Sequence, residues 1–258
     1  MNFQVESQSV TVNVADQGAL LASVAGRLVS RQGFALATIN LDHLVKLRQS
    51  ARFRAAYAEQ DLIAADGNPV VWLSRLAGHS VHLVPGSDVV VPLAAEAARA
   101  GRSIALVGST DVTLQVAAAV LKQAVPGLEI ALCLAPPMGF DVDGAEADAV
   151  LAELARRNVG LCFLALGAPK QEILAARGRH LAPNVGFASV GAALDFLAGA
   201  EVRAPMIMRR LSMEWVWRMM QNPSRMVPRY AACAALLPIL AADALKLRQK
   251  AVGLRHRA

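Results

Sequence analysis

Leu62-Ile63-Ala64-Ala65-Asp66-Gly67-Asn68-Pro69 is the stretch from which the fold can be worked out. Four apolar residues followed by Asp66, Gly67 and Pro69 predict a short buried strand that ends in a turn. Asp66 then stands at the carboxyl end of a strand, where open α/β sheets bind their ligands, so its carboxylate is a candidate general base. The alternative is that Asp66 caps a helix that begins near Pro69.

Strands and helices alternate on both sides of this stretch. An edge strand is predicted at 10–14, and further strands at 34–40, 81–84, 103–108, 128–134, 159–166 and 185–190. Helices are predicted between them, including one capped by Asp16 that runs to about Arg31, one over 41–59, one over 69–77, one over 88–99 and one over 145–157. This order predicts an α/β fold with a doubly wound, mostly parallel, Rossmann-like sheet.

The pattern changes after Gly199, where only helices are predicted, over 205–221 and 224–250. We therefore expect an α/β catalytic domain over residues 1–199 and a helical basic C-terminal appendage over residues 200–258. The appendage carries eleven Lys and Arg against three acids, a net charge of +8, which leaves −2 for the first 200 residues of a chain whose total is +6. Such asymmetry indicates an anionic partner, either a membrane surface, a phosphate-bearing ligand or a nucleic acid; a solvated basic helix is the alternative.

Composition narrows these choices. The chain of 258 residues is 55% apolar, which suits a globular protein with a large core, and only 5% aromatic, which argues against a base-stacking nucleic-acid platform. Cys133, Cys162 and Cys233 lack C-x-x-C spacing and lie in apolar runs, so a reducing, cytoplasmic setting is expected. The first residues do not resemble a secretory signal.

An apolar run at 231–242, interrupted by Pro238, lies within the appendage. It is shorter than the ~20 residues that cross a bilayer. An interfacial helix with flanking basic residues is the favoured interpretation, and a core or oligomer helix is the alternative.

Other polar residues lie at the ends of predicted strands or directly after them. Thr38 and Asn40 are expected on one face beside Asp66, either as ligand donors or, for Asn40, as a local helix cap. Gly108-Ser109-Thr110 could present backbone N–H groups to a phosphate, although neither a P-loop nor a complete dinucleotide fingerprint is present.

Two later turns are also candidates for a site. In Gly167-Ala168-Pro169-Lys170-Gln171-Glu172, Lys170 and Gln171 fall at a helix N-terminus, which suits an anion or a sugar hydroxyl. An exposed polar first turn is the alternative. The D-x-D pair Asp141 and Asp143 resembles a metal-binding motif of glycosyltransferases, but a turn and cap explain it more simply because no further carboxylate or His flanks it.

Six motifs in order resemble the TagA/WecG/CpsF family of bacterial glycosyltransferases from about Val10 to Tyr230. They are Thr38-Ile39-Asn40, Ala65-Asp66-Gly67, the segment 167–172, the segment 191–196 with Asp195, Arg203-Ala204-Pro205, and Glu214-Trp215 with Arg218. The resemblance implies a UDP-sugar donor, a polyprenyl-diphosphate-linked sugar acceptor, and inversion at the anomeric carbon without an obligatory metal. N-acetylmannosamine or another hexose is the implied sugar, and cell-surface polysaccharide synthesis the implied process.

The resemblance also implies roles for individual residues. Asp66 matches the catalytic base, and Thr38, Asn40 and Gln171 match pocket residues. Arg218, Arg225 and Arg229 match residues of the appendage that close over the site and contact the diphosphate. The substrate-binding set predicted from residues and resemblance together is Thr38, Asn40, Gly67, Gly108, Lys170, Gln171, Asp195, Arg218, Arg225 and Arg229, with no metal ligand.

We accordingly expect an enzyme without a cofactor, since the UDP-sugar is a substrate, attached peripherally to the inner face of the cytoplasmic membrane. Its expected partners are the UDP-sugar, the lipid-linked acceptor and the anionic membrane surface, with homo-oligomerisation as an open alternative and no nucleic acid. A nucleotide-dependent oxidoreductase on a Rossmann-like sheet is the competing function, disfavoured by the missing fingerprint. A non-catalytic basic module is the third.

Overall fold

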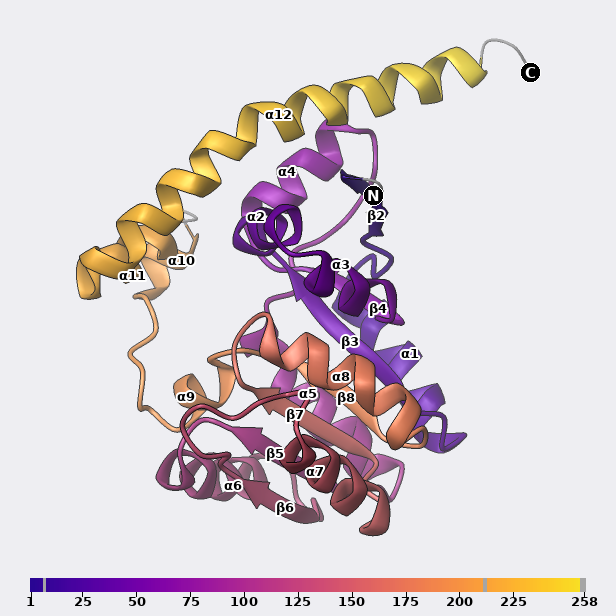
Figure 1. Cartoon of the computed structure of the whole chain (residues 1–258), viewed down its shortest axis with the longest axis vertical. Helices are drawn as coiled ribbons and strands as arrows, with labels where there is room; N and C mark the ends of the chain where they lie inside the picture. Colours follow the sequence, from indigo (N-terminus) through magenta and orange to yellow (C-terminus); the bar gives the residue numbers. More distant parts are fainter. Residues whose placement is uncertain (7, 211–212, 256–258) are drawn as a thin grey trace.

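A parallel six-stranded sheet forms the centre of the computed structural model, which describes residues 1–6, 8–210 and 213–255 (Figure 1). The strand order is β4-β3-β8-β7-β5-β6 and every pairing within it is parallel. The strands are β3 (Phe34–Ile39), β4 (Leu62–Ala65), β5 (Ile104–Gly108), β6 (Ile130–Leu134), β7 (Leu161–Ala165) and β8 (Gly186–Ser189). The predicted doubly wound α/β fold is confirmed.

Helices cover both faces of this sheet. One face packs on α1 (Gln17–Val29), α5 (Gly86–Arg99), α6 (Asp111–Ala124) and the short α9 (Ala193–Leu197). The other face packs on α2 (Leu41–Gln49), α3 (Ala51–Ala58), α7 (Ala145–Arg156) and α8 (Lys170–Leu181), with α4 (Asn68–Leu76) beside α2. Because both faces are covered, the strands are almost entirely apolar rather than alternating.

The predicted strand at 10–14 is not an edge of this sheet. Residues Gln8–Thr11 form β2, which pairs antiparallel with β1 (Asn2–Val5) in a separate two-stranded ribbon. The ribbon packs on the body through the buried side chains of Phe3, Val5 and Val10, which belong to the same hydrophobic cluster as α2 and α4. Buried and exposed residues alternate along the ribbon, so one of its faces covers this cluster.

A second predicted strand, at 81–84, does not form: the structure describes these residues, and they pair with no strand among the described residues. Residues 79–85 are an extended connection, which is tied to the body by hydrogen bonds from Val84 N to Ala65 O and from His82 N to Ala15 O, both 2.8 Å. Single hydrogen bonds of this kind hold a chain in place without forming a ladder.

Two predicted helices are interrupted. The helix over 41–59 divides at Ser50, whose hydroxyl accepts a hydrogen bond from Phe53 N and so begins α3. The helix over 205–221 divides into α10 (Met206–Arg210) and α11 (Glu214–Gln221), with residues 211–212 outside the described part. The predicted cap at Asp16 is confirmed, because its side chain accepts from Ala19 N at 2.8 Å.

The long helix α12 (Pro223–Arg255) crosses over α2 and α4, and its far end projects past the rest of the molecule (Figure 1). Leu236, Leu240 and Ala244 are buried against the body, whereas Ile239 and Leu245 are exposed. Among the described residues, the helical segment 223–250 is long and apolar enough to span a bilayer. The predicted shortfall concerns the apolar run 231–242, which lies inside this longer helix; the helix continues through Pro228 and Pro238, so the length of the run alone does not exclude a span.

Candidate active site

All six parallel strands end at one edge of the sheet, which we call the carboxyl edge, and five of them are followed there by the residues considered below. The first residues after β3, β4, β5, β7 and β8 are Asn40, Asp66, Ser109, Leu166 and Val190, followed by the turn glycines Gly67, Gly167 and Gly191. Since parallel strands point the same way, these positions face the same side of the molecule, where α/β sheets bind ligands. The predicted meeting of Asp66, Thr38 and the 167–172 turn at one edge is confirmed in this sense.

Asp66 follows β4 directly and its position is fixed by its backbone. Its N–H donates to Ile39 O at 2.8 Å, and its carboxylate accepts a long hydrogen bond from Thr38 Oγ1 at 3.5 Å. Gly67, in a conformation with φ of 126°, is the N-cap of α4, and no side chain caps that helix. The alternative interpretation of Asp66 as a helix cap is therefore wrong.

The pKa of Asp66 is raised by burial, an effect that the charges of His43 and Arg218 oppose and that of Glu214 reinforces. A carboxylate with raised proton affinity, next to a partly open edge, has the properties of a general base. The charges that act on it come from α2 and from α11. The appendage therefore reaches the carboxyl edge.

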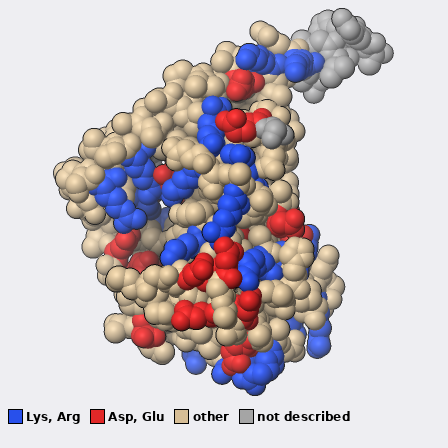
Figure 2. All heavy atoms as spheres, in the orientation of Figure 1, with Lys and Arg blue, Asp and Glu red and all other residues tan. Residues whose placement is uncertain are grey.

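Arg218 is the residue that brings the appendage to this edge. Its guanidinium carbon lies 5.4 Å from the centre of the Phe196 ring, a cation–π distance, and Nη2 lies 3.1 Å from Glu214 Oε1. Phe196 belongs to α9, directly after β8. Figure 2 shows Lys and Arg side chains gathered beside a hollow on the face where α11 and the start of α12 overhang the sheet in Figure 1.

Arg229 and Arg225 are placed differently. Arg229 Nη2 and Lys46 Nζ each lie 2.9 Å from Asp42 Oδ2, so one buried carboxylate joins α12 to α2. Burial raises the pKa of Asp42, but Lys46 and Arg229 together bring it below its ordinary value. Arg225 is exposed.

Several of the residues predicted to bind ligand have polar atoms that are hydrogen-bonded within the protein. Asn40 caps α2, its Oδ1 accepting from His43 N at 3.1 Å, which confirms the local-cap alternative. Gln171 is buried, and its Oε1 accepts from Gly191 N at 3.0 Å. Lys170 donates to Phe140 O at 2.8 Å, and Asp195 Oδ1 accepts from Ser109 Oγ at 2.5 Å.

The Gly108 turn is built for close packing. A Cβ at Gly108 would lie 2.4 Å from Ala165 O, so this position requires glycine as β5 ends against β7. Ser109 N donates to Ala165 O at 3.1 Å, and the Thr110 hydroxyl caps α6. The Ser109 N–H already has a hydrogen-bond acceptor in the protein. The prediction that this N–H binds a phosphate is therefore not supported.

The D-x-D pair forms a turn. Asp141 Oδ1 accepts from Asp143 N at 3.0 Å, and Asp143 pairs with Arg52. The N-cap of α7 is Gly144, so the turn part of the simpler interpretation is confirmed and the side-chain cap is not. Across the described ranges, no three His, Cys, Asp or Glu side chains cluster closely enough to hold a metal ion.

Two buried ionisable residues have no role predicted from the sequence, although Glu172 ends the segment 167–172. Glu172 is 0% exposed and His43 is 7% exposed, and they meet between α8 and α2. Tyr57 lies beside them, its hydroxyl donating to Thr38 O at 2.9 Å, and its pKa is raised well above the ordinary value by burial and by the charges of Glu172 and Asp66. Nothing in the local sequence signals that these side chains converge.

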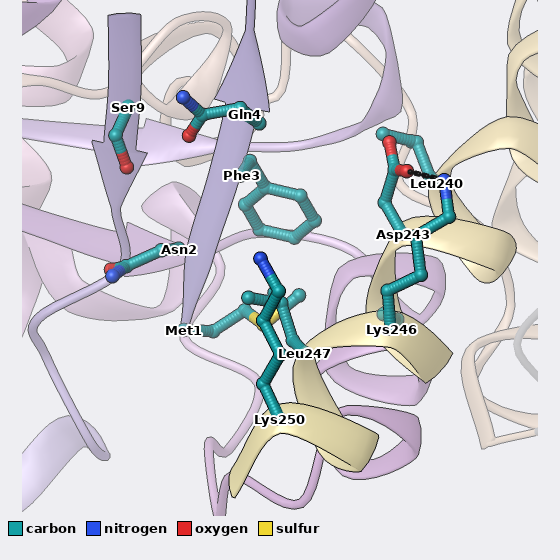
Figure 3. A pocket seen from close by; sticks show the side chains of 11 residues that line it. Met1, Asn2, Phe3, Gln4, Ser9, Leu240, Asp243, Lys246, Leu247 and Lys250 are labelled. Carbon is teal, nitrogen blue, oxygen red and sulfur yellow. Dashed lines mark hydrogen bonds and ion pairs between the residues drawn. The ribbon is translucent and has the colours of Figure 1, made fainter.

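A cavity of about 420 Å³ lies away from Asp66, between the β1–β2 ribbon and the last turns of α12. Phe3, Leu240 and Leu247 provide apolar walls, and the Lys250 side chain extends toward Phe3 (Figure 3). Lys246 lies on its rim, bonded to Asp243 at 3.2 Å. This cavity, beside the later turns of α12, is therefore separate from the carboxyl edge where Asp66 lies.

The fold and the carboxyl edge together define an α/β enzyme with a half-buried carboxylate facing a basic appendage. The family can be stated as well. The chain belongs to the Glycosyl transferase WecG/TagA/CpsF family, whose model matches residues 5–251, and it is a glycosyltransferase. The resemblance in its motifs is confirmed, and the oxidoreductase alternative is set aside.

Two curated relatives carry the same name, N-acetylglucosaminyldiphosphoundecaprenol N-acetyl-beta-D-mannosaminyltransferase. The protein of Bacillus spizizenii (strain ATCC 23059 / NRRL B-14472 / W23) is 28% identical over 211 residues, 79% of each chain. The protein of Bacillus subtilis (strain 168) is 28% identical over 207 residues, 77% of this chain and 78% of its own.

Proposed function

We propose that this enzyme transfers a sugar from a UDP-sugar to a polyprenyl-diphosphate-linked sugar in the synthesis of a cell-envelope polysaccharide. The names of the two relatives support this, because they specify an N-acetylglucosaminyl-diphosphoundecaprenol acceptor and N-acetylmannosamine as the sugar transferred. N-acetylmannosamine is therefore the first donor sugar to test.

Asp66 carries the proposal. Its carboxylate stands at the carboxyl edge with a raised pKa, beside Thr38 and within the field of Arg218. In an inverting transfer the acceptor hydroxyl gives its proton to Asp66 while the oxygen of that hydroxyl forms a bond to the anomeric carbon. The bond from that carbon to the UDP oxygen breaks on the opposite face, and its electron pair leaves with the diphosphate.

The leaving diphosphate gains negative charge, which positive groups must stabilise. We propose that Arg218 supplies the nearest such charge, with Arg229 and Lys46 around Asp42 as further cations. Lys170 at the start of α8 adds another, together with the N-terminal dipole of that helix. In this proposal the protein's own cations replace a metal ion.

We also propose that the appendage holds the enzyme at the inner face of the cytoplasmic membrane. The exposed apolar side chains of α12, including Ile239 and Leu245, alternate along the chain with basic residues such as Lys246 and Arg248. Helices of this composition bind at lipid interfaces. The cavity at Phe3 and Lys250 places an ammonium group over an apolar floor, which suits the same surface (Figure 3).

The test uses the purified full chain with a panel of UDP-sugars and a synthetic polyprenyl-diphosphate-linked N-acetylglucosamine. We expect product from at least one UDP-sugar, and from Asp66→Asn a loss of about 10²–10⁴-fold in turnover with UDP-sugar binding retained in calorimetry. Glu129→Gln, which removes an exposed carboxylate at the opposite edge of the sheet, should leave turnover unchanged. Equal turnover by the wild type and Asp66→Asn would remove Asp66 as the base.

A further inference from the structure

A buried carboxylate and a buried imidazole meet behind the carboxyl edge. Glu172, on the first turn of α8, is 0% exposed, and its Oε1 lies 3.5 Å from Nε2 of His43 on α2. Among the described residues, neither His43 Nε2 nor Glu172 Oε2 has a hydrogen-bond partner. A carboxylate taken out of water needs a compensating charge, and the His43 ring is placed to supply one when it is protonated.

Hydrogen bonds extend from this pair in two directions. Glu172 Oε1 accepts from Gln171 Nε2 at 2.8 Å, and Gln171 Oε1 accepts from Gly191 N at 3.0 Å. On the other side, His43 Nδ1 lies 2.8 Å from Asn40 Oδ1 and 3.3 Å from Asn40 N; a protonated Nδ1 donates to the oxygen, and a neutral one accepts from the N–H. The pair therefore links the exits of β3, β7 and β8.

The charge on Glu172 decides how the Gln171 amide is oriented. A carboxylate can only accept, so it must face the NH₂ group of Gln171, which leaves the amide oxygen for Gly191 N. An uncharged glutamine at 172 could donate as well as accept, and the Gln171 amide could then reverse. The loop after β8, which leads to Asp195 and Phe196, would lose its fixed contact.

His43 is also joined to the strand beside the candidate base: its ring contacts Asn40 at the end of β3, and Thr38 in the same strand donates to Asp66 Oδ2 at 3.5 Å. Its charge acts on Asp66 from α2, in the direction that favours the ionised carboxylate. The other ionisable groups around His43 are Asp42 on its own helix, Tyr57 on α3 and Glu172 on α8. Phe53 and Tyr57 supply ring contacts at centroid distances of 6.1 and 6.2 Å, so the setting is mostly apolar.

We propose that Glu172 and His43 form a buried ion pair that positions the transfer reaction: Glu172 fixes Gln171 and the loop after β8, and the His43 imidazolium holds a positive charge toward Asp66. Both are positioning residues, because neither side chain is exposed enough to meet the substrate. The inference rests on the proposed function for its catalytic part. Its structural part, an ionised pair, stands independently.

The first test does not depend on activity. Full-length protein with ¹⁵N-labelled histidine is examined by NMR, and the His43 ring signals are assigned by their loss in His43→Gln. We expect both ring nitrogens to be protonated at pH 7 in the wild type, and the ring to become neutral in Glu172→Gln. A neutral His43 at pH 7 in the wild type would overturn the proposal.

The second test measures kcat and KM against pH for His43→Gln, Glu172→Gln and the double variant. We expect each single variant to lower kcat/KM about tenfold, and the double variant to be no worse than the poorer single one, because both break one interaction. In His43→Gln the acid limb of the kcat/KM profile should move to higher pH, since Asp66 loses a charge that favours its ionised form.

The chain contains a matched control. His180 Nε2 and Glu59 Oε2 also lie 3.5 Å apart, but these side chains are 71% and 52% exposed. His180→Gln and Glu59→Gln should leave kcat, KM and the pH profile unchanged. If a variant at the buried pair fails to fold, Glu172→Asp, which keeps the charge, should retain folded protein with a protonated His43.

The outcomes separate the two proposals. If the wild type transfers sugar and the buried variants behave like the exposed controls, the positioning role is wrong. If the wild type transfers no sugar from any UDP-sugar, the proposed function fails, and the NMR result alone decides whether the ion pair exists.

Discussion

The carboxyl edge and the C-terminal appendage are held by different kinds of contact. At the edge, Gln171 and Glu172 are buried and bonded to each other, and Gln171 reaches the loop after another strand. In the appendage, α11 has no buried residue, and α12 meets the body through one apolar stripe and the Asp42–Arg229 ion pair.

Under the proposed function, this difference separates two tasks. The groups that would hold a precise geometry lie on strands and helices that fold together, whereas the proposed counter-charge for the diphosphate lies on helices with fewer buried contacts. Elements of low local stability are the ones that move when ligands bind. The first experiments below therefore test the edge, and the later ones test the appendage and the surface.

The largest effect is expected at Asp66. Turnover should fall about 10²–10⁴-fold in Asp66→Asn, and the acid limb of the wild-type kcat/KM profile should disappear from the residual activity.

The same Asp66→Asn change should raise the melting temperature at pH 7. Because the pKa of Asp66 is raised in the folded state, the folded protein binds that proton more tightly than the unfolded chain, so ionisation above the unfolded pKa costs stability. Calorimetric scans at pH 5 and pH 8 measure the difference in melting temperature between Asp66→Asn and the wild type. The prediction is wrong if the variant melts at a lower temperature than the wild type at pH 8.

A smaller loss is expected at Arg218, where the appendage touches the edge. Arg218→Gln should lower kcat/KM about 10²-fold, because one positioned charge that stabilises a leaving anion has roughly this value. Arg225→Gln, which changes an exposed side chain on the same appendage, should cost less. Steady-state kinetics on both variants rank them. Equal losses would mean that the appendage acts by its total charge rather than by one placed guanidinium.

The appendage can be tested alone by its affinity for membranes. Changing Lys246, Arg248 and Lys250 together to Gln should weaken binding to phosphatidylglycerol vesicles about 10²-fold, at ~1 kcal/mol for each basic residue. Sedimentation of vesicles measures the bound fraction. The matched control changes Lys122, Arg156 and Arg157, which removes the same charge from α6, from α7 and from the residue that caps the C-terminus of α7, and should leave binding unaffected.

The smallest effect is expected at the D-x-D turn. Asp143→Asn should change turnover by less than about twofold, because its exposed ion pair with Arg52 is worth ~0–1 kcal/mol. Initial rates with and without a chelator complete the experiment, and we expect them to be equal. A strong loss in Asp143→Asn that added Mg²⁺ partly reverses would restore the metal interpretation.

Much of the fold could be predicted because its signals are local. Strand β4 ends at Ala65, directly before the turn predicted at Asp66-Gly67, and Asp16 caps α1 as its position indicates. Errors arose where local patterns compete with tertiary contacts. The helix predicted over 41–59 breaks because the Ser50 hydroxyl offers a new start, and residues 81–84 have strand-like composition but only single tethering bonds.

The site was predictable only in part. The positions of Asp66 and Thr38 follow from the ends of strands that the apolar runs define. The meeting of His43 with Glu172 does not, because the two lie 129 positions apart and neither has a distinctive local pattern. The orientation of the Gln171 amide depends on that meeting, so it could not be predicted from the sequence either.

The strand order also determines when the site can form during folding. β4, which carries Asp66 at its end, pairs in the sheet only with β3, and β3 pairs on its other side with β8, Phe34 opposite Gly186. That pairing joins residues 152 positions apart, so it must close a long loop before its contacts can compensate for the lost chain entropy. A nascent chain therefore cannot complete the surroundings of Asp66 until the ribosome has released almost three quarters of the protein, and assembly of the carboxyl edge is a late event in its synthesis.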